Sequence, residues 1–142
     1  MAERTVVLLK PDSFERGLAE EILDELEEVG EIVKSKKKQL SDYEIEKIYG
    51  HLKDEDAWPA LKEYMSRGKC MACLFEGENI LKRINDKIGR TRPEDSSSET
   101  IRGKYGIPSF EQDDNRLENL VHSSLNCQEA QSEEELLFGN DE

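Results

Sequence analysis

Three side chains that suit phosphoryl chemistry occur at the edges of apolar segments or within a long polar one. Lys10 comes directly after the apolar residues 6–9, Arg102 lies in the polar stretch 90–115, and His122 follows that stretch. Lysine and arginine neutralise phosphate oxygens, and arginine can do so with two parallel hydrogen bonds. Neutral imidazole is available near pH 7 and is a competent nucleophile towards phosphorus. By themselves these three residues are a weak signal, because most domains contain a few such side chains.

Two other kinds of site have less support. Cys70 and Cys73 have the spacing of a redox or metal pair, but they lie in an apolar run with no second cysteine pair. Residues i and i+3 of a strand point to opposite faces, which favours a buried structural role for both cysteines. The chain has two histidines, His51 and His122, and neither an H-E-x-x-H nor a G-x-x-x-x-G-K-[ST] motif. A zinc site and a P-loop are therefore not predicted.

Length and charge narrow the class of protein. The chain has 142 residues, 20 basic and 33 acidic side chains, a formal charge of −13 and a mean hydropathy of −0.80. This length suits one domain, and the acidic balance argues against broad binding to the backbone of DNA or RNA. No apolar run approaches the roughly 20 residues that cross a bilayer. The opening residues lack a signal-peptide layout, and three cysteines do not make a disulfide framework. We therefore expect a cytoplasmic protein that binds neither a membrane nor a specific nucleic acid.

Hydrophobic periodicity predicts strands interspersed with helices, which is typical of an α+β or α/β domain. Residues 34–38 are mostly lysines, and a solvated edge strand explains them better than a phosphate-attracting patch does. The stretch 90–115 has no apolar period and is predicted to be a long loop, which is usually functional or disordered. Strands are expected at residues 6–9, 32–38, 70–75 and 117–122, and helices at 18–29, 41–52, 58–68, 80–88 and 128–137.

Six short motifs occur in order along nearly the whole chain. They are E-R-T-V-V-L-L-K-P-D at 3–12 with E-R-G-L at 15–18, Y-G-H-L-K-D at 49–54, E-Y-M-S-R-G at 63–68, E-G-E-N at 76–79, T-I-R-G-K-Y-G at 100–106 and N-L-V-H-S-S at 119–124. In this order they resemble the nucleoside diphosphate kinase family over residues 3–138. No single motif carries the resemblance, but six collinear ones are specific.

The resemblance implies a fold and an activity. The fold would be α+β and ferredoxin-like, with a four-stranded antiparallel sheet and helices packed on one face, in a single domain of residues 1–138 followed by an acidic tail at 139–142. The activity would be ping-pong transfer of the γ-phosphoryl group of ATP to nucleoside diphosphates through a phosphohistidine. Mg²⁺ would bridge the nucleotide phosphates rather than occupy a protein cage. The family also forms homo-oligomers built from dimers, with nucleoside di- and triphosphates as its small-molecule partners.

The same resemblance implies roles for seven residues. His122 matches the nucleophile, and Glu133 matches the carboxylate that orients its imidazole. Without the resemblance, Glu133 is equally well explained as a solvated helix carboxylate, and Tyr49 as a core aromatic. The remaining matches are Lys10 and Arg102 as the cations that hold the polyphosphate, Thr91 as a phosphate-contacting hydroxyl, Asn119 as a sugar-contacting amide, and Tyr49 as a tyrosine lining the site near Lys10.

Departures from the family pattern affect nucleotide binding first. Ala57 replaces the usual base-stacking phenylalanine, and its neighbour Trp58 is expected to point into the core. Asn85 replaces a phosphate-binding arginine. Losing a base stack can cost on the order of 1 kcal/mol, and losing a charge-assisted hydrogen bond about 1.5–3 kcal/mol. Three other arginines are candidates to supply the missing cation, namely Arg83, Arg90 and Arg116.

Two further departures lie around the histidine. The common Gly-Ser-Asp after it reads Ser123-Ser124-Leu125, and the stretch between Gly106 and Asn119 is longer than usual and lacks the Gly-Arg before the asparagine. These changes leave an alternative open, namely a catalytically weak or inactive nucleotide-binding or assembly module on the same fold. The retention of a lysine, an arginine and a histidine at the matching positions favours the enzyme.

Overall fold

The computed structural model describes residues 3–107, 112 and 118–139. Its centre is one antiparallel sheet in the order β2-β3-β1-β4, in which the central strands are β1 (Glu3–Leu9) and β3 (Lys69–Gly77). The edge strands are β2 (Glu31–Gln39) and β4 (Val121–Ser123). The predicted four-stranded α+β sheet is therefore confirmed, and β4 is shorter than the strand predicted at 117–122.

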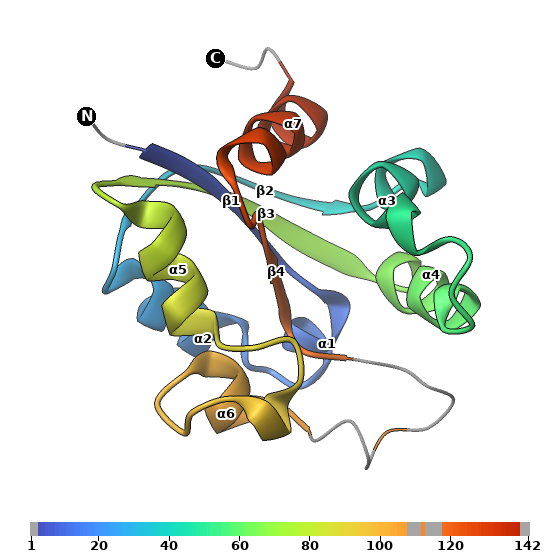
Figure 1. The fold of residues 1–142 in the computed structure, drawn as a ribbon, viewed down its shortest axis with the longest axis horizontal. Helices are drawn as coiled ribbons and strands as arrows, with labels where there is room; N and C mark the ends of the chain where they lie inside the picture. The colour runs from blue at the N-terminus through green and yellow to red at the C-terminus, as the bar shows by residue number, and fades with distance from the viewer. Residues whose placement is uncertain (1–2, 108–111, 113–117, 140–142) are drawn as a thin grey trace.

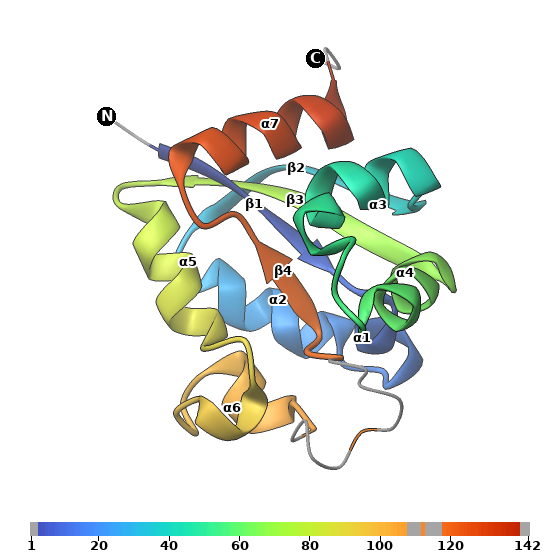
Figure 2. The same cartoon turned by 45° about the vertical axis from the view of Figure 1, so that its right-hand side comes forward.

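Helices cover both faces of this sheet, as Figures 1 and 2 show, so the expectation that they cover one face is wrong. The reason is the alternation within β1, whose run of apolar residues supplies both faces with a period of two. Val6 and Leu8 belong to one core cluster, and Val7 and Leu9 belong to the other. Cys70 belongs to the first cluster and Cys73 to the second, and both side chains are fully buried, as predicted.

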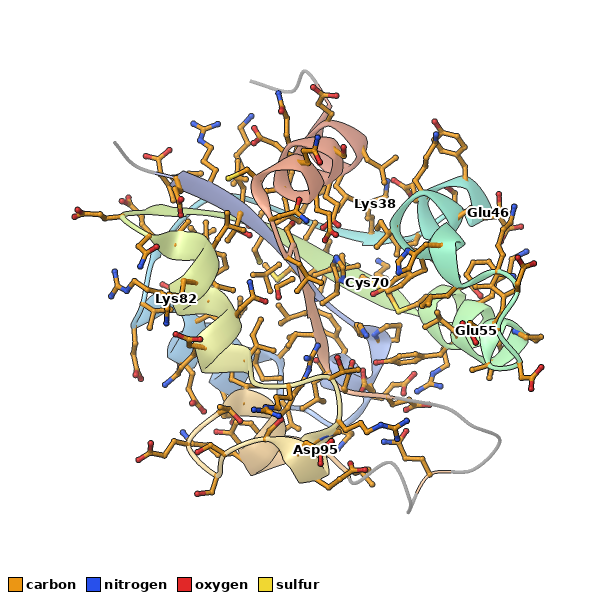
Figure 3. The ribbon with its side chains drawn as sticks, in the orientation of Figure 1. Lys38, Glu46, Glu55, Cys70, Lys82 and Asp95 are labelled. Atoms are coloured by element: carbon orange, nitrogen blue, oxygen red, sulfur yellow. The ribbon has the colours of Figure 1, made fainter. Side chains whose placement is uncertain are left out.

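The first core cluster lies under three helices. These are α3 (Asp42–Tyr49), α4 (Trp58–Ser66) and α7 (Cys127–Phe138), and the 3₁₀ turn Gly50–Leu52 continues α3. A capping box begins α3, because the Ser41 hydroxyl accepts from the Glu44 amide and the Glu44 carboxylate accepts from the Ser41 amide. The Asn126 side chain caps α7 by accepting from the Glu129 amide. Figure 3 shows the side chain of Cys70 inside the molecule, whereas that of Lys82 projects from its periphery.

The second core cluster lies under α2 (Ala19–Glu27) and α5 (Ile80–Ile88). Ile80, Ile84 and Ile88 recur at helical spacing on the buried side of α5. The lysine-rich part of β2 forms an edge of the sheet and is mostly exposed, as predicted.

Two short helices occupy segments in which the sequence predicts no helix. Pro11 is the first residue of α1 (Pro11–Glu15), where the missing N–H of proline costs nothing and its φ suits a helix. The other helix, α6 (Ile101–Tyr105), follows the 3₁₀ turn Pro93–Asp95. Thr100 caps α6 by accepting from the Gly103 amide, and Ile101 is buried in the second core cluster. The predicted 90–115 loop is therefore partly ordered secondary structure.

Two expectations fall largely or wholly outside the described part of the chain. The predicted acidic tail, 139–142, lies outside it apart from Gly139, and so does Arg116.

None of the described helices is long and apolar enough to span a membrane.

Candidate active site

A cleft of about 1530 Å³ is lined by residues of β4 and of the helices α3, α5 and α7. Elements from the whole length of the chain contribute to its wall. The cleft is lined by all seven residues to which the family resemblance assigns a role, namely Lys10, Tyr49, Thr91, Arg102, Asn119, His122 and Glu133.

Lys10 lies directly after β1, as the residue before α1, and is buried in the cleft wall, with 5% of its surface exposed. Its Nζ donates to Oδ1 of Asn119 over 2.7 Å, and its backbone N–H donates to the Leu120 carbonyl. Burial, and then the nearby positive charge of Arg102, lower the pKa of Lys10 to about 7. The nearby charges of Asp12 and Glu118 offset these two effects only in part, and a bound phosphate would favour the charged ammonium form further.

Asn119 connects the lysine to the opposite wall of the cleft. Its Nδ2 donates to the Thr91 carbonyl over 2.8 Å, and its own backbone carbonyl accepts from Arg102 Nε over 3.2 Å. The amide of Asn119 thus joins β1 to the segment after α5. Thr91 itself is exposed, and its backbone makes this contact rather than its hydroxyl.

Arg102 enters the site from α6 and is held by main-chain carbonyls. Besides Asn119, its guanidinium donates to the carbonyls of Gly89 (3.3 Å), Arg90 (3.1 Å) and Val121 (2.5 Å). Burial lowers its pKa to about 10, which still leaves it charged at neutral pH. Neutral carbonyls fix its orientation, and within the described part of the chain no carboxylate accepts a hydrogen bond from it.

His122 pairs with the carboxylate of α7. Its Nε2 lies 2.9 Å from Oε1 of Glu133, and the same oxygen accepts the Ser124 hydroxyl over 2.9 Å. Because an ionised carboxylate only accepts hydrogen bonds, this contact places the imidazole proton on Nε2. The lone pair of Nδ1 is then free for nucleophilic attack.

The ring of Tyr49 packs against both His122 and Lys10. Its ring meets the His122 ring edge-on with centroids 5.3 Å apart, and Lys10 Nζ lies 5.6 Å from the tyrosine ring centroid. Burial raises the pKa of its phenol well above the ordinary value, so the hydroxyl stays protonated. That buried hydroxyl has no hydrogen-bond partner in the described part of the chain.

Asn85, which replaces an arginine of the family pattern, is engaged with the strand that carries the histidine. Its Nδ2 donates to the carbonyls of Leu81 (2.8 Å) and Ser124 (3.0 Å), and its Oδ1 accepts the Ser123 hydroxyl over 2.6 Å. The two departures from the family pattern, at 85 and 123, thus bond to each other. The amide ties α5 to β4 instead of offering a cation to the cleft.

The three candidate replacement cations differ in position. Arg90 lines the cleft next to Thr91 and is exposed, whereas Arg83 does not line it. The backbone of Arg90 is fixed, since its N–H donates to the Ser96 hydroxyl and its carbonyl accepts from Arg102. Of the two candidates within the described residues, only Arg90 is therefore placed to reach a ligand.

The wall where a nucleobase could stack is aliphatic. Ala57 and Leu61 line the cleft, whereas Trp58 does not and packs, partly buried, against the first core cluster. The expectation that Trp58 points towards the core is confirmed.

Sequence reasoning missed the residues that shape the backbone before β4. Leu120 has φ 74°, in the left-handed region that costs a non-glycine residue about 1–2 kcal/mol. Its carbonyl accepts from the Ser13 hydroxyl over 2.6 Å, and its N–H donates to Oδ2 of Asp12 over 3.2 Å. Both partners are buried in α1. The position of Asp12 and Ser13, immediately after Lys10 and Pro11, was the available signal, but their partner lies 107–108 residues away.

Comparison with known proteins decides the family. The family model described as nucleoside diphosphate kinase matches residues 3–142. This chain belongs to the nucleoside diphosphate kinase family. Among curated nucleoside diphosphate kinases, the protein from Saccharolobus solfataricus is 33% identical over 97% of this chain and 96% of its own length. Nucleoside diphosphate kinase A1 of Xenopus laevis is 36% identical over 99% of this chain and 87% of its own.

Solved structures of nucleoside diphosphate kinases agree with the fold. The crystal structure from Encephalitozoon cuniculi superposes with a TM-score of 0.87 at 30% identity, covering 98% of this chain and 90% of that one. The structure from Borrelia burgdorferi, a transition-state mimic with bound vanadate and ADP, gives a TM-score of 0.89 at 25% identity, covering 99% and 89%. The predicted family and the ferredoxin-like α+β fold are confirmed. Nucleoside diphosphate kinases are phosphotransferases, so the comparisons favour the enzyme over the non-catalytic alternative.

Proposed function

We propose that this chain transfers the γ-phosphoryl group of ATP to nucleoside diphosphates by a ping-pong mechanism, with His122 as the nucleophile. One observation carries the proposal. Glu133 occupies Nε2 of the imidazole and leaves Nδ1 free in a cleft that also holds Lys10 and Arg102. A nucleophile and two cations in one cleft are the parts that in-line phosphoryl transfer needs.

In the first half-reaction, Nδ1 of His122 attacks the γ-phosphorus. A phosphorus–nitrogen bond forms, the bond from the γ-phosphorus to the bridging oxygen breaks, and that oxygen leaves with the nucleoside diphosphate. In the second half-reaction, a terminal oxygen of another diphosphate attacks the phosphohistidine and the phosphorus–nitrogen bond breaks. The covalent intermediate lets one cleft serve donor and acceptor in turn.

The other residues bind and orient. Lys10 and Arg102 would neutralise the charge that develops on the phosphoryl oxygens, and neither needs to move far because both are fixed by hydrogen bonds. The hydroxyl of Thr91 would contact a phosphate and the amide of Asn119 the sugar. We assign to Arg90 the role of an additional phosphate-binding cation, because its side chain lines the cleft. Asn85, which replaces the family arginine, has no positive charge, and its side chain bonds to Ser123.

The negative charge of Glu133 stabilises the imidazole as positive charge develops on it during attack. The Ser124 hydroxyl donates to the same carboxylate oxygen and so keeps the Glu133 side chain directed at the imidazole ring. Tyr49 packs the other side of the site, where its edge limits the tilt of the imidazole.

Magnesium fits this site as part of the nucleotide. Among the described residues, no group of three or more His, Cys, Asp or Glu side chains is placed to hold a metal ion. We therefore propose that Mg²⁺ arrives bound to the phosphates, where it supplies further charge neutralisation. Assembly as a homo-oligomer built from dimers, a cytoplasmic location and a single domain over residues 1–138 stay predictions.

Initial-rate kinetics with ATP as donor and GDP as acceptor test the proposal. A ping-pong enzyme gives parallel lines in double-reciprocal plots, because the donor's product leaves before the acceptor binds. Intersecting lines would require both nucleotides to bind together and would contradict the mechanism. Binding of ADP without any formation of GTP would favour the inactive nucleotide-binding module instead.

A further inference from the structure

Arg67 bonds to two carboxylates that come from distant parts of the chain. Its Nε and Nη2 contact the two oxygens of Glu15 at 2.8 and 2.6 Å, and its Nη1 and Nη2 contact the two oxygens of Glu118 at 2.8 and 2.9 Å. Each carboxylate is thus held by two hydrogen bonds, the geometry for which the planar guanidinium is suited. We call these three residues the Arg67 bridge.

The bridge joins three elements next to the candidate active site. Glu15 is the last residue of α1, Arg67 follows α4, and Glu118 immediately precedes Asn119. Figure 2 shows α1 and α4 close to the end of β4 at which the chain enters that strand. The bridge therefore fixes the point at which the segment after α6 returns to the sheet.

A second series of contacts connects Arg67 to the backbone just after Asn119. Its guanidinium carbon lies 5.0 Å from the centroid of the Tyr64 ring, and the Tyr64 hydroxyl donates to Oδ1 of Asp12 over 2.6 Å. The other oxygen of Asp12 accepts the N–H of Leu120, the residue in the left-handed conformation. The residues on both sides of Asn119 are thus connected to Arg67.

The backbone of Glu118 is held as well as its side chain. Its N–H donates to Oε1 of Gln112 over 2.7 Å, and its carbonyl accepts from Nε2 of the same residue over 3.2 Å. The side chains of Arg67 and Glu118 are each 21% exposed, so solvent screens this ion pair less than a fully exposed one.

We propose that Arg67 is a positioning residue for nucleotide binding, acting through Glu118 on Asn119. The inference rests on the proposed function, in which the Asn119 amide contacts the nucleotide and also bonds to Lys10. Loss of the bridge would let residue 118 move and would displace that amide. Arg67 itself does not line the cleft and need not touch the substrate.

The histidine depends less on the bridge than the asparagine does. His122 lies within β4, where its register opposite Leu8 is set by pairing with β1. Asn119 precedes the strand and has no such partner in the sheet register. We therefore expect the bridge to govern nucleotide affinity and KM, with little effect on kcat at saturating nucleotide.

A double-mutant cycle on ADP binding tests this. By calorimetry, Arg67→Gln and Glu118→Gln should each weaken binding about three- to tenfold, and the double variant no more than either single one, because all three break the same pair. KM for ADP should rise in parallel, with kcat nearly unchanged. Arg67→Lys should give a smaller loss, since an ammonium group keeps the charge but not the paired geometry.

Two controls separate positioning from general stability. Arg4 also binds two carboxylates, Glu76 and Glu134, on the surface, so Arg4→Gln removes a similar arginine without touching residue 118. Glu15→Gln removes the α1 half of the bridge and leaves the pair with Glu118. Arg4→Gln should bind ADP within about twofold of the parent chain, as expected for an exposed ion pair, and Glu15→Gln should weaken binding less than Glu118→Gln does.

The outcomes distinguish the two claims. If the parent chain binds ADP and makes GTP, but Arg67→Gln and Glu118→Gln bind ADP as the parent does, the positioning role is overturned and the proposed function stands. Additive losses in the double variant would also overturn it. If the parent chain neither binds ADP nor transfers phosphate, the proposed function fails, and the inference fails with it. Should Arg67→Gln not fold, the isosteric Glu118→Gln decides the matter.

Discussion

His122 and Glu133, on β4 and α7, meet through Nε2 and Oε1 at 2.9 Å, and Ser124 binds the same carboxylate oxygen. The contact is largely shielded from solvent, since the histidine side chain is 15% and the glutamate side chain 9% exposed. A fixed carboxylate at one ring nitrogen determines which nitrogen can attack. The pair therefore links the orientation of the imidazole to its reactivity.

Glu133→Gln removes this charge and keeps the shape of the side chain. We expect the rate of phosphoryl transfer to fall roughly ten- to a hundredfold, because the developing imidazolium loses its counter-charge. ADP affinity should not change. Rapid-quench measurement of the first half-reaction checks the rate, with Glu134→Gln as control, because that neighbour bonds Arg4 outside the cleft. Equal rates in the two variants would remove Glu133 from the mechanism.

The lowered pKa of Lys10 predicts a pH dependence of nucleotide binding. The free chain holds Lys10 at a pKa of about 7, and a bound phosphate favours the charged ammonium form, so binding takes up a proton. ADP affinity should therefore decrease as the pH rises through 7. Calorimetry in buffers of different ionisation heat measures the proton uptake.

Lys10→Met supplies the control for that measurement. It should weaken ADP binding by about 1.5–3 kcal/mol, the value of a charge-assisted hydrogen bond, and should lose the lysine's share of the proton uptake. Uptake that is the same in the parent chain and in Lys10→Met would show that another group titrates on binding.

Arg90 is predicted to supply the cation that Asn85 does not. Arg90→Ala should weaken ADP binding about tenfold, as expected for a partly solvated contact between arginine and phosphate. Arg83→Ala, which removes an exposed arginine that does not line the cleft, should leave binding unchanged. If calorimetry gives the two variants the same dissociation constant, Arg90 does not contact the nucleotide.

Ala57→Phe is predicted to strengthen base binding. Residue 57 lines the cleft, and an aromatic ring there can stack on a nucleobase and add up to about 1 kcal/mol. The gain should be similar for ADP, GDP and CDP, because every base presents a π-face. The competing possibility is that Trp58 already stacks on the base. In that case ADP would quench its fluorescence strongly and Trp58→Leu would weaken binding.

Much of the fold follows from local patterns in the sequence. The short apolar run at 6–9 that Pro11 ends, the capping box at Ser41 and the helical spacing of Ile80, Ile84 and Ile88 each predict the element that the structure contains. The helices α1 and α6 are too short to show a period. Contacts with distant residues hold α6 in place, since Lys104 and Tyr105 both bond to Glu25 of α2 over 2.7 Å. No local rule identifies such partners.

The site residues also divide into those that the local sequence indicates and those that depend on contacts with distant residues. Lysine, arginine and histidine are recognisable as phosphate-binding or nucleophilic types, but their meeting depends on the order of strands in the sheet. Only the family resemblance indicates Glu133, because a carboxylate on an acidic helix has no distinguishing local feature. The bond between Asn85 and Ser123 could not be predicted, since it joins residues 38 positions apart on two elements.

Labelling with γ-³²P-ATP tests the central claim, that His122 carries the phosphoryl group. The parent chain should take up label that is acid-labile and base-stable, and GDP should discharge it as labelled GTP. His122→Gln should take up none, although its circular dichroism and ADP affinity match the parent, whereas His51→Gln, which removes the other histidine, should label normally. Stoichiometric, GDP-dischargeable label on His122→Gln would contradict the account.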